Sequence, residues 1–341
     1  MNLLRPTPPP YDPIAWARTP FPERGRVVCE AWALQGYGTP FFAYAIHVLK
    51  VALYVGAWFF FCGFTPGLGG LATAGDWWLS PVAFQKAILW SMLFEGLGLG
   101  CGFGPLTGRY FPPLGGFLYF LRPGTTKLPP WPGLPLFGGT RRSWLDVALY
   151  AALVALLLRA LVAPALDVAT LAPIAALVPL LGLADRTMFL ALRPEHYWTT
   201  LACFVLAGTA AEGPGAEAWI AGAKAVQLAL WFWAGVSKLN HHFPSVVCVM
   251  TSNSPFAAWP ALRRRMYRRY PDDLRPSWVA VAMGHAGTAL ELGVPLVLGL
   301  SRGGWSLVLG MGLMLALHAF ITGNVPMGVP IEWNVMVVYG A

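Results

Sequence analysis

The sequence predicts an all-α fold, a polytopic bundle of about eight or nine transmembrane helices with its N-terminus in the cytoplasm. Three observations lead to this prediction: 57% of the 341 residues are hydrophobic, only 11% are charged, and long apolar runs recur along the chain. An ordinary soluble protein has about 25% charged residues. The few charges here argue against a soluble enzyme, and the abundant apolar residues argue against disorder.

The apolar runs follow a cytoplasmic N-terminal segment, residues 1–40, which shows no cleavable signal peptide. A helix that crosses a hydrocarbon core of about 30 Å needs about 20 apolar residues. The transmembrane bundle is therefore predicted over 41–341. A ninth run begins near residue 330, and the chain stops inside it at Ala341, so we expect a truncated ninth span. The eight preceding spans are predicted at 41–64, 82–104, 144–163, 168–190, 197–211, 218–239, 277–300 and 304–322.

The basic residues alternate between the two sides of these spans. Eighteen Lys and Arg residues lie in the N-terminal segment, in the cytoplasmic loops 105–143 and 240–276 with their flanks, and around Arg193. Only Arg159 and Arg302 lie on the other side. Because basic residues accumulate on the cytoplasmic side, this asymmetry fixes the predicted orientation.

The segment 254–270 is predicted as an interfacial helix. Ser254 suits its N-cap and Pro255 its first position. Such a helix either anchors the topology or binds the anionic head groups of membrane lipids. One stripe carries Trp259, Leu262, Met266 and Tyr270, and the rest carries Arg263, Arg264, Arg265, Arg268 and Arg269.

Ionisable residues also lie inside the predicted spans, where each costs about 2.5–3.5 kcal/mol on insertion. Each one alone has a structural explanation, such as a lysine that reaches the head groups. As a set at one depth, they predict a buried polar pocket that opens toward the cytoplasm. In the predicted orientation, the residues in the cytoplasmic half are His47, Lys50, Glu95, Lys238, His285, His318 and Glu332.

Lys238 is the strongest candidate for a functional group. It follows the aromatic stretch 230–233 and Gly235, which permits close approach of a helix or a flat ligand. A lysine in an apolar pocket favours its neutral form and is then a usable general base. The aromatic neighbours suit a flat apolar ligand such as a quinone.

The sequence lacks the motifs of common metal-binding, nucleotide-binding and hydrolase sites. The cysteines show no C-x-x-C spacing and the histidines no H-E-x-x-H spacing, so we expect no metal site. No Walker A, dinucleotide-binding or G-x-S-x-G pattern stands in a fitting context. The net charge of +8 belongs to the cytoplasmic loops, so no nucleic-acid partner is expected.

The stretch Phe232–Leu239 resembles the vitamin K-dependent gamma-carboxylase superfamily, also called horizontally transferred transmembrane domains (HTTM). Segments 192–198, 234–250, 270–277 and 326–334 resemble a related family of uncharacterised bacterial membrane proteins. The resemblance implies a carboxylase-like, multi-pass protein of the bacterial inner membrane. It also implies that Lys238 is the base that deprotonates a reduced quinone. Because the large extra-membrane domain of the carboxylase has no counterpart, carboxylation of a protein substrate is not expected.

Two hypotheses follow, and whether the protein is an enzyme stays open. In the first, the bundle binds a quinone or another isoprenoid lipid, with Lys238 as base and with His285, His318 and Glu291 as orienting or proton-relaying groups. In the second, it is a lipid-binding or transport protein, or a subunit of a membrane complex, and the charges form a structural ion network. The predicted cofactor-binding residues are Trp231, Gly235, Asn240, His242, Glu95, His47, Lys50 and Glu332.

Overall fold

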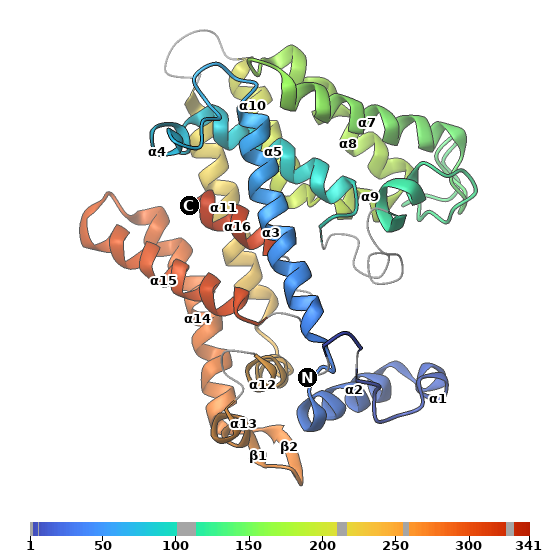
Figure 1. The fold of residues 1–341 in the computed structure, drawn as a ribbon, viewed down its shortest axis with the longest axis vertical. Coiled ribbons are helices and arrows are strands. Elements are labelled where there is room, and N and C mark those ends of the chain that lie inside the picture. Colours follow the sequence, from blue (N-terminus) through green and yellow to red (C-terminus); the bar gives the residue numbers. More distant parts are fainter. Residues whose placement is uncertain (1–2, 6, 101–113, 210–216, 255–258, 325–330) are drawn as a thin grey trace. The chain divides into compact units, whose positions relative to one another are not determined.

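The computed structural model describes residues 3–5, 7–100, 114–209, 217–254, 259–324 and 331–341, and they are mostly helical (Figure 1). The chain divides into two compact units. Unit 1 contains Met1–Leu49 and Trp231–Val329, and unit 2 contains Lys50–Leu230 and Pro330–Ala341. The boundaries between them fall inside two long helices, α3 (Phe41–Cys62) and α11 (Ala218–Ser237).

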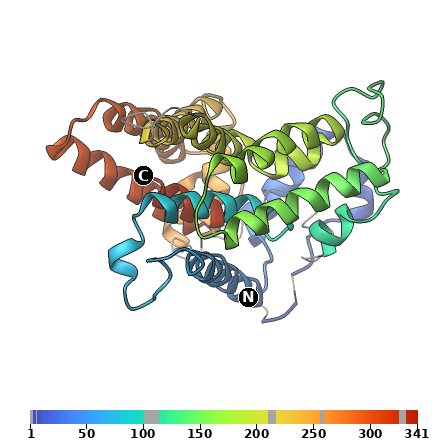
Figure 2. The ribbon, with the colours of Figure 1, turned by 90° about the horizontal axis from the view of Figure 1, so that it is seen from above.

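Unit 2 is built around α5 (Pro81–Gly96), which is buried on every side from Lys86 to Gly96. The sequence of α5 is apolar around nearly its whole circumference, as expected for a central helix. The helices α7 and α8 run side by side, as two views show (Figures 1 and 2). The other elements of unit 2 are α4 (Ala74–Trp77), η1 (Leu114–Leu118), α7 (Trp144–Val162), α8 (Val168–Ala184), α9 (Arg186–Ala191), η2 (Pro194–Trp198), α10 (Thr199–Gly208) and α16 (Ile331–Tyr339).

Lys86 shows how α5 carries a charge in this core. Its Nζ donates to the carbonyl oxygens of Phe61 and Leu161, both at 2.9 Å. These carbonyls lie in the last turns of α3 and α7. Carbonyl groups in the last turn of a helix have no hydrogen-bond partner within that helix. The buried ammonium group therefore fastens the ends of two helices to α5.

The predicted span 168–190 is two helices, because the chain breaks at Asp185. Its side chain pairs with Arg142 Nη2 at 2.7 Å and accepts hydrogen bonds from the backbone N–H groups of Leu128 and Thr187. The last of these bonds caps α9. Asp185 thus follows the last residue of α8, caps the start of α9 and binds the loop that precedes α7.

Unit 1 has a smaller core, in which α2 packs against α12. Asn253 Nδ2 donates to the carbonyl oxygen of Trp32 at 3.0 Å and ties these two helices together. The helix α2 lies in the N-terminal segment, which the sequence placed only as a cytoplasmic segment. The elements of unit 1 are α1 (Pro13–Arg18), α2 (Phe21–Gln35), α12 (Phe243–Asn253), α13 (Pro260–Met266), β1 (Tyr267–Arg269), β2 (Asp273–Pro276), α14 (Trp278–Leu300) and α15 (Gly304–Thr322).

The predicted helix over 254–270 is wrong. Ser254 ends α12 and donates to the carbonyl oxygen of Gly323 at 2.9 Å, and α13 begins only at Pro260. After Met266 the chain forms an antiparallel hairpin, in which Tyr267 pairs with Pro276. Met266 and Tyr267 are buried in the core of unit 1. Met266 and Tyr267 therefore pack in the protein core rather than against lipid. Pro255 lies outside the described residues.

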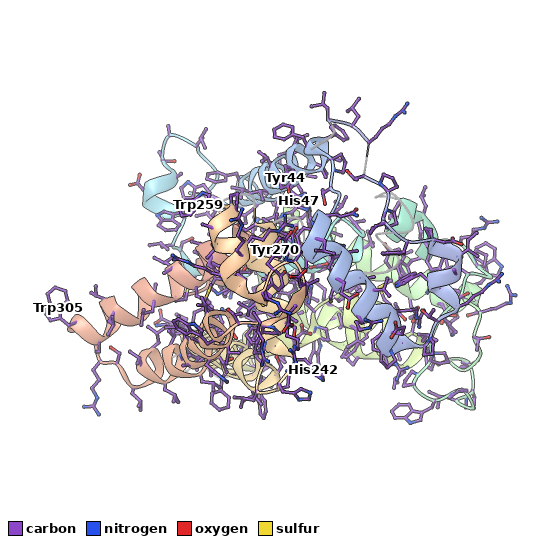
Figure 3. The ribbon with its side chains drawn as sticks, turned by 90° about the horizontal axis from the view of Figure 1, so that it is seen from below. Tyr44, His47, His242, Trp259, Tyr270 and Trp305 are labelled. Atoms are coloured by element: carbon purple, nitrogen blue, oxygen red, sulfur yellow. The ribbon has the colours of Figure 1, made fainter. Side chains whose placement is uncertain are left out.

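Four of the described helices are long and apolar enough to cross a membrane: α3, α7, α14 and α15. They agree with the predicted spans at 41–64, 144–163, 277–300 and 304–322. The ends of the predicted spans at 104 and 211, and the start of the run near 330, lie outside the described residues. The total number of spans and their orientation stay predictions. Trp305, at the start of α15, is 87% exposed and stands away from the ribbon (Figure 3).

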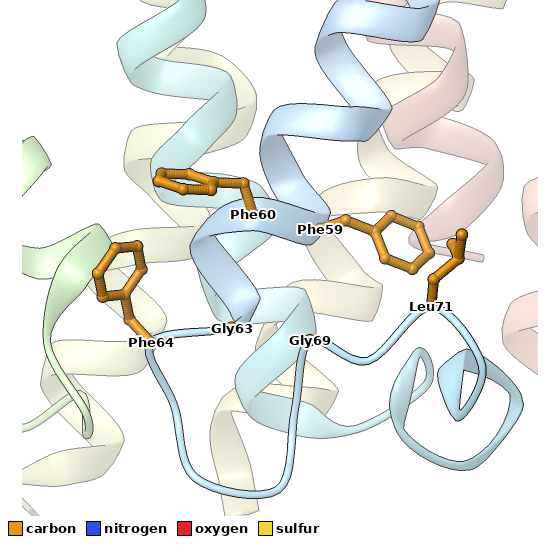
Figure 4. Close-up of a pocket in the computed structure, with 6 residues that line it drawn as sticks. All are labelled: Phe59, Phe60, Gly63, Phe64, Gly69 and Leu71. Carbon is orange, nitrogen blue, oxygen red and sulfur yellow. The ribbon is translucent and has the colours of Figure 1, made fainter.

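An apolar hollow lies at the C-terminal end of α3. Phe59, Phe60 and Phe64 line it together with Leu71 from the following loop (Figure 4). The loop folds back closely enough that a Cβ on Gly69 would lie 2.2 Å from the Cα of Gly63. The described side chains that line the hollow are apolar.

The Arg142–Asp185 pair gives the first testable prediction. Replacing Asp185 with Ala leaves Arg142 buried without its partner, which typically costs about 3–5 kcal/mol. The control is Asp167→Ala, which removes an exposed N-cap and should cost about 1 kcal/mol. Denaturant unfolding of the purified variants measures both. Equal losses for the two variants would show that the buried pair does not hold this region together.

Candidate functional site

Lys238 of unit 1 forms an ion pair with Glu291 of α14. Lys238 lies directly after the last residue of α11, and its side chain is 27% exposed, whereas that of Glu291 is only 5% exposed. The ammonium group also lies 5.5 Å from the ring centroid of Phe243, within the range of a cation–π interaction. The pair thus has an accessible cationic end and a buried carboxylate end.

Gly235 allows α11 to approach α14 beside this pair. A Cβ at Gly235 would lie 2.9 Å from the side chain of Leu292 and 3.1 Å from the Cβ of Glu291. A side chain at this position would have to displace the Leu292 side chain, and glycine permits the contact without that shift. The sequence prediction of a close approach at Gly235 agrees with the structure, and the partner that fills the space is α14.

Trp231, four residues before Gly235, donates from Nε1 to Nε2 of His318 on α15 at 3.0 Å. Because the indole N–H only donates, His318 Nε2 accepts, and its ring is in the tautomer protonated at Nδ1. Both side chains are less than 5% exposed. The bond joins α11 and α15 within unit 1, two helical turns from Lys238.

Four other predicted residues do not join this cluster. His285 is exposed on α14, and Asn240 is exposed after α11. His242 is also exposed there (Figure 3). Asn240 Oδ1 accepts from the backbone N–H groups of His242 and Phe243, so it supports the start of α12. His47 Nδ1 lies 2.6 Å from the carbonyl oxygen of Ala43 in its own helix. These contacts are local, and they assign the four residues no common site.

Unit 2 contains a second cluster, which includes three of the predicted residues. Lys50 Nζ lies 2.8 Å from Glu332 Oε2, and Arg193 Nε lies 3.6 Å from Glu95 Oε1. Both carboxylate side chains are 1% exposed, whereas Lys50 is 18% and Arg193 25% exposed. The pairs join α3 to α16 and α5 to the turn before η2.

Sequence reasoning missed three members of this second cluster: Arg193, His196 and Tyr197. His196 is 2% exposed, its ring centroid lies 4.8 Å from that of Tyr197, and the ring of Trp333 meets it edge-on at 6.3 Å. The π-helical turn η2 and the left-handed backbone of Arg193 (φ 52°) bring these side chains inward. The segment 192–198 was noticed only for its resemblance, because a π-helical turn has no hydrophobic period that reveals it.

The predicted site residues therefore form two clusters, each inside one unit. One pocket with all of the predicted residues would have to contain residues of both units. It therefore stays a prediction. Across the described ranges, no three His, Cys, Asp or Glu side chains gather in a way that would hold a metal ion.

One comparison with known proteins shows the class of the molecule. Residues 1–341 match a family described as transmembrane protein of unknown function (DUF3556). No curated protein and no solved structure matches the chain. The sequence family and the structure thus support the conclusion that the chain is a membrane protein with several apolar helices.

The second cluster gives a prediction about pH. Burial, reinforced by Arg193, lowers the pKa of His196 to about 3, against about 6.5 for an unfolded histidine. Below pH 6.5 the unfolded chain binds a proton that the folded chain excludes, so stability is full above pH 6.5 and falls with decreasing pH. Between pH 6.5 and 5 this effect amounts to about 2 kcal/mol.

The measurement is thermal unfolding of the purified protein from pH 8 to pH 5, compared with His196→Gln. The variant lacks the imidazole, so its stability should fall less steeply over this range. Identical slopes for the two proteins would contradict the buried neutral state of His196.

Proposed function

We propose that this chain, which belongs to the DUF3556 family of transmembrane proteins, binds a lipid-soluble ligand with a polar head group at the Lys238–Glu291 pair. A quinone or another isoprenoid lipid is the ligand class that fits the aromatic surroundings of the pair. The observation that carries the proposal is the pair itself, a buried carboxylate held by a cation that stays partly accessible at the end of an apolar helix.

Glu291 has capacity for one more hydrogen bond. Its Oε2 is buried and has no hydrogen-bond partner among the described residues. A buried carboxylate oxygen without a donor is costly, by about 1–3 kcal/mol or more. A ligand hydroxyl, such as that of a reduced quinone, would donate to Oε2 and remove this cost, and its oxygen would lie next to the Lys238 ammonium group.

The same geometry changes the proposed roles in proton transfer. Lys238 was expected to act as the base; we propose instead that its ammonium group stays paired with Glu291 and stabilises negative charge on the ligand. The group ready to accept a proton from a ligand hydroxyl is the Glu291 carboxylate. Transfer would give a carboxylic acid at Glu291 and a ligand oxyanion, which the Lys238 ammonium group would stabilise. His318 would keep Trp231 and α11 in place through its hydrogen bond.

The resemblance of Phe232–Leu239 to the gamma-carboxylase and HTTM superfamily supports this ligand class, because that superfamily places a lysine beside a reduced quinone. The resemblance extends the proposal to a carboxylase-like helix bundle in a bacterial inner membrane. It does not extend to a protein substrate.

A second candidate function rests on a different observation. Lys127–Asp146 and Arg142–Asp185 of unit 2 are buried ion pairs that fasten loops to helices. If Lys238–Glu291 is a fastening of the same kind, the protein is a non-enzymatic lipid-binding or transport protein, or a subunit of a membrane complex. In the first function the Lys238–Glu291 pair must also bind a ligand. In the second function it only holds helices together.

The test compares three variants of the pair. Lys238→Met leaves the carboxylate without its cation and should lower the free energy of unfolding by about 2 kcal/mol, less than for a fully buried pair because the lysine is partly exposed. The exchange Lys238→Glu with Glu291→Lys restores opposite charges and should recover most of that loss. Glu291→Gln keeps the shape but removes the proton acceptor.

The deciding measurement is mass spectrometry of lipid extracts from the purified variants. The wild type should retain a quinone or isoprenoid lipid, and both Glu291→Gln and the charge exchange should lose it, although the exchange is stable. Retention of the same lipid by all folded variants would contradict the ligand site. Only bulk phospholipid in the wild-type extract would favour the second function.

Anionic lipid head groups are the proposed partners of the basic segment after α12. Arg264, Arg265, Arg268 and Arg269 are exposed there. Arg263 is half-buried instead, and its Nη2 lies 3.5 Å from the carbonyl oxygen of Trp32, so it contributes to the protein interior. The attraction to an anionic leaflet is electrostatic, about 1 kcal/mol per residue near the surface.

The corresponding prediction is that replacing these four exposed arginines with Gln lowers the amount of co-purified anionic phospholipid. The control is Arg275→Gln, because Arg275 is exposed but already pairs with Asp273 at 2.7 Å. Phospholipid analysis by mass spectrometry measures both variants. An unchanged content of anionic lipid in the fourfold variant would refute this surface.

A further inference from the structure

The apolar hollow at the C-terminal end of α3 has no part in the proposed function. It has a volume of about 500 Å³, within the range of ligand-binding sites in proteins. Three phenylalanine rings and Leu71 form its walls, and Gly63 and Gly69 lie between them (Figure 4). Phe60, Phe64 and Leu71 are exposed, Leu71 to 80%. A group of large exposed apolar side chains marks a surface that contacts another molecule or a membrane.

The length of α3 matches the thickness of a bilayer. The helix has 22 residues and is apolar enough to cross a membrane. At about 1.5 Å per residue it is about 33 Å long, and a hydrocarbon core is about 30 Å thick. A helix of this length that spans the core has its two ends at the two boundaries with the head groups. The hollow surrounds one of these ends.

An uncharged, outward-facing stripe of α3 continues into the hollow. Leu53, Gly56, Phe60 and Phe64 follow one another at helical spacing, and all four are exposed. The sequence has no charged residue from Val51 to Gly75. In a transmembrane protein, lipid chains are the surroundings that suit such a stripe. Because the hollow continues the stripe, the same lipid chains can reach it.

The loop after α3 folds into short turns with internal hydrogen bonds. The backbone N–H groups of residues 63–65 donate to carbonyl oxygens at the end of α3. Trp77 Nε1 and Thr73 Oγ1 both donate to the carbonyl oxygen of Gly70, at 3.1 and 3.2 Å. A polar group that contacts lipid chains cannot bond to water there, so internal bonds are what a lipid-facing loop requires.

Tryptophan and tyrosine side chains gather at the same end of α3. The ring centroid of Trp58 lies 5.6 Å from that of Trp77 and 5.2 Å from that of Tyr339. The ring of Trp78, which is exposed, lies 6.2 Å from that of Tyr339. These residue types are enriched at the boundary between hydrocarbon and head groups. The aromatic side chains therefore indicate the same membrane level as the length of α3.

We propose that the loop from Gly63 to Leu79 lies in the membrane boundary and that the acyl chain of a membrane phospholipid occupies the hollow. The described side chains that form the walls are apolar, so they recognise the chain and not its head group. A helix is about 10 Å across, so about 500 Å³ holds little more than one helical turn but much of a flexible chain. The hollow belongs to unit 2, and its lipid does not depend on the ligand proposed at the Lys238–Glu291 pair.

Photo-crosslinking of the full-length protein in phosphatidylcholine vesicles tests the proposal. A photoreactive p-benzoylphenylalanine replaces Leu71 in one protein and Leu136 in another, because Leu136 is 77% exposed in a different loop of unit 2. Illumination should attach an acyl chain at position 71, with a several-fold lower yield at position 136 by mass spectrometry of the peptides. Equal yields would show unspecific contact with lipid and overturn the proposal. An adduct at position 71 with a second protein chain instead of lipid would also overturn it.

A pair of glycine variants distinguishes the hollow from simple contact with the bilayer. A Cβ at Gly69 would lie 2.2 Å from the Cα of Gly63, so Gly69→Ala displaces the loop from α3, whereas Gly56→Ala meets open space. With the photoreactive group at position 71, Gly69→Ala should lower the yield of acyl-chain adduct several-fold, and Gly56→Ala should leave it unchanged. If Gly69→Ala does not fold, Phe60→Gln replaces it, because it brings an amide group to the hollow at an exposed position. An unchanged yield in the folded variant would contradict a chain seated in the hollow.

Discussion

The requirement that a buried charge have a partner governs this structure more than any other constraint. In an apolar interior an isolated charge is very costly, and a well-placed opposite charge or carbonyl offsets that cost. The protein satisfies the requirement in different ways: Lys86 binds two helix-end carbonyls, Arg142 binds Asp185, and Lys238 binds Glu291. Because each partner comes from a different element, every buried charge also fixes how two elements lie against each other.

This constraint separates structural charges from candidate functional ones. At Lys86 and Arg142 the charged groups have hydrogen-bond partners: Lys86 Nζ donates to two carbonyl oxygens, and Arg142 donates from Nε and Nη2. At Glu291, in contrast, a buried carboxylate oxygen has no hydrogen-bond partner among the described residues. Incomplete satisfaction of a buried charged group is unfavourable for stability, and a group of this kind beside a partly exposed cation is the physical basis for the ligand proposed there.

The two clusters carry different chemistry. Lys238 and Glu291 lie beside the ring of Phe243, and the Lys238 side chain is partly exposed. The cluster around Glu95 is more enclosed, since Glu95, His196 and Tyr197 are at most 2% exposed.

The sequence alone determined the class of molecule and the positions of its long helices, because hydrophobic composition and run length are local properties. It also selected Lys238, Gly235, Trp231, Glu291 and His318 as candidates, since they share helical stripes or stand out as polar residues in apolar runs. Only the tertiary structure decided which charges pair, that His285 faces outward, and that His196 and Tyr197 turn inward. The reason is that partners such as Lys50 and Glu332 are distant in sequence, and a π-helical turn or a break at Asp185 depends on contacts that no local pattern encodes.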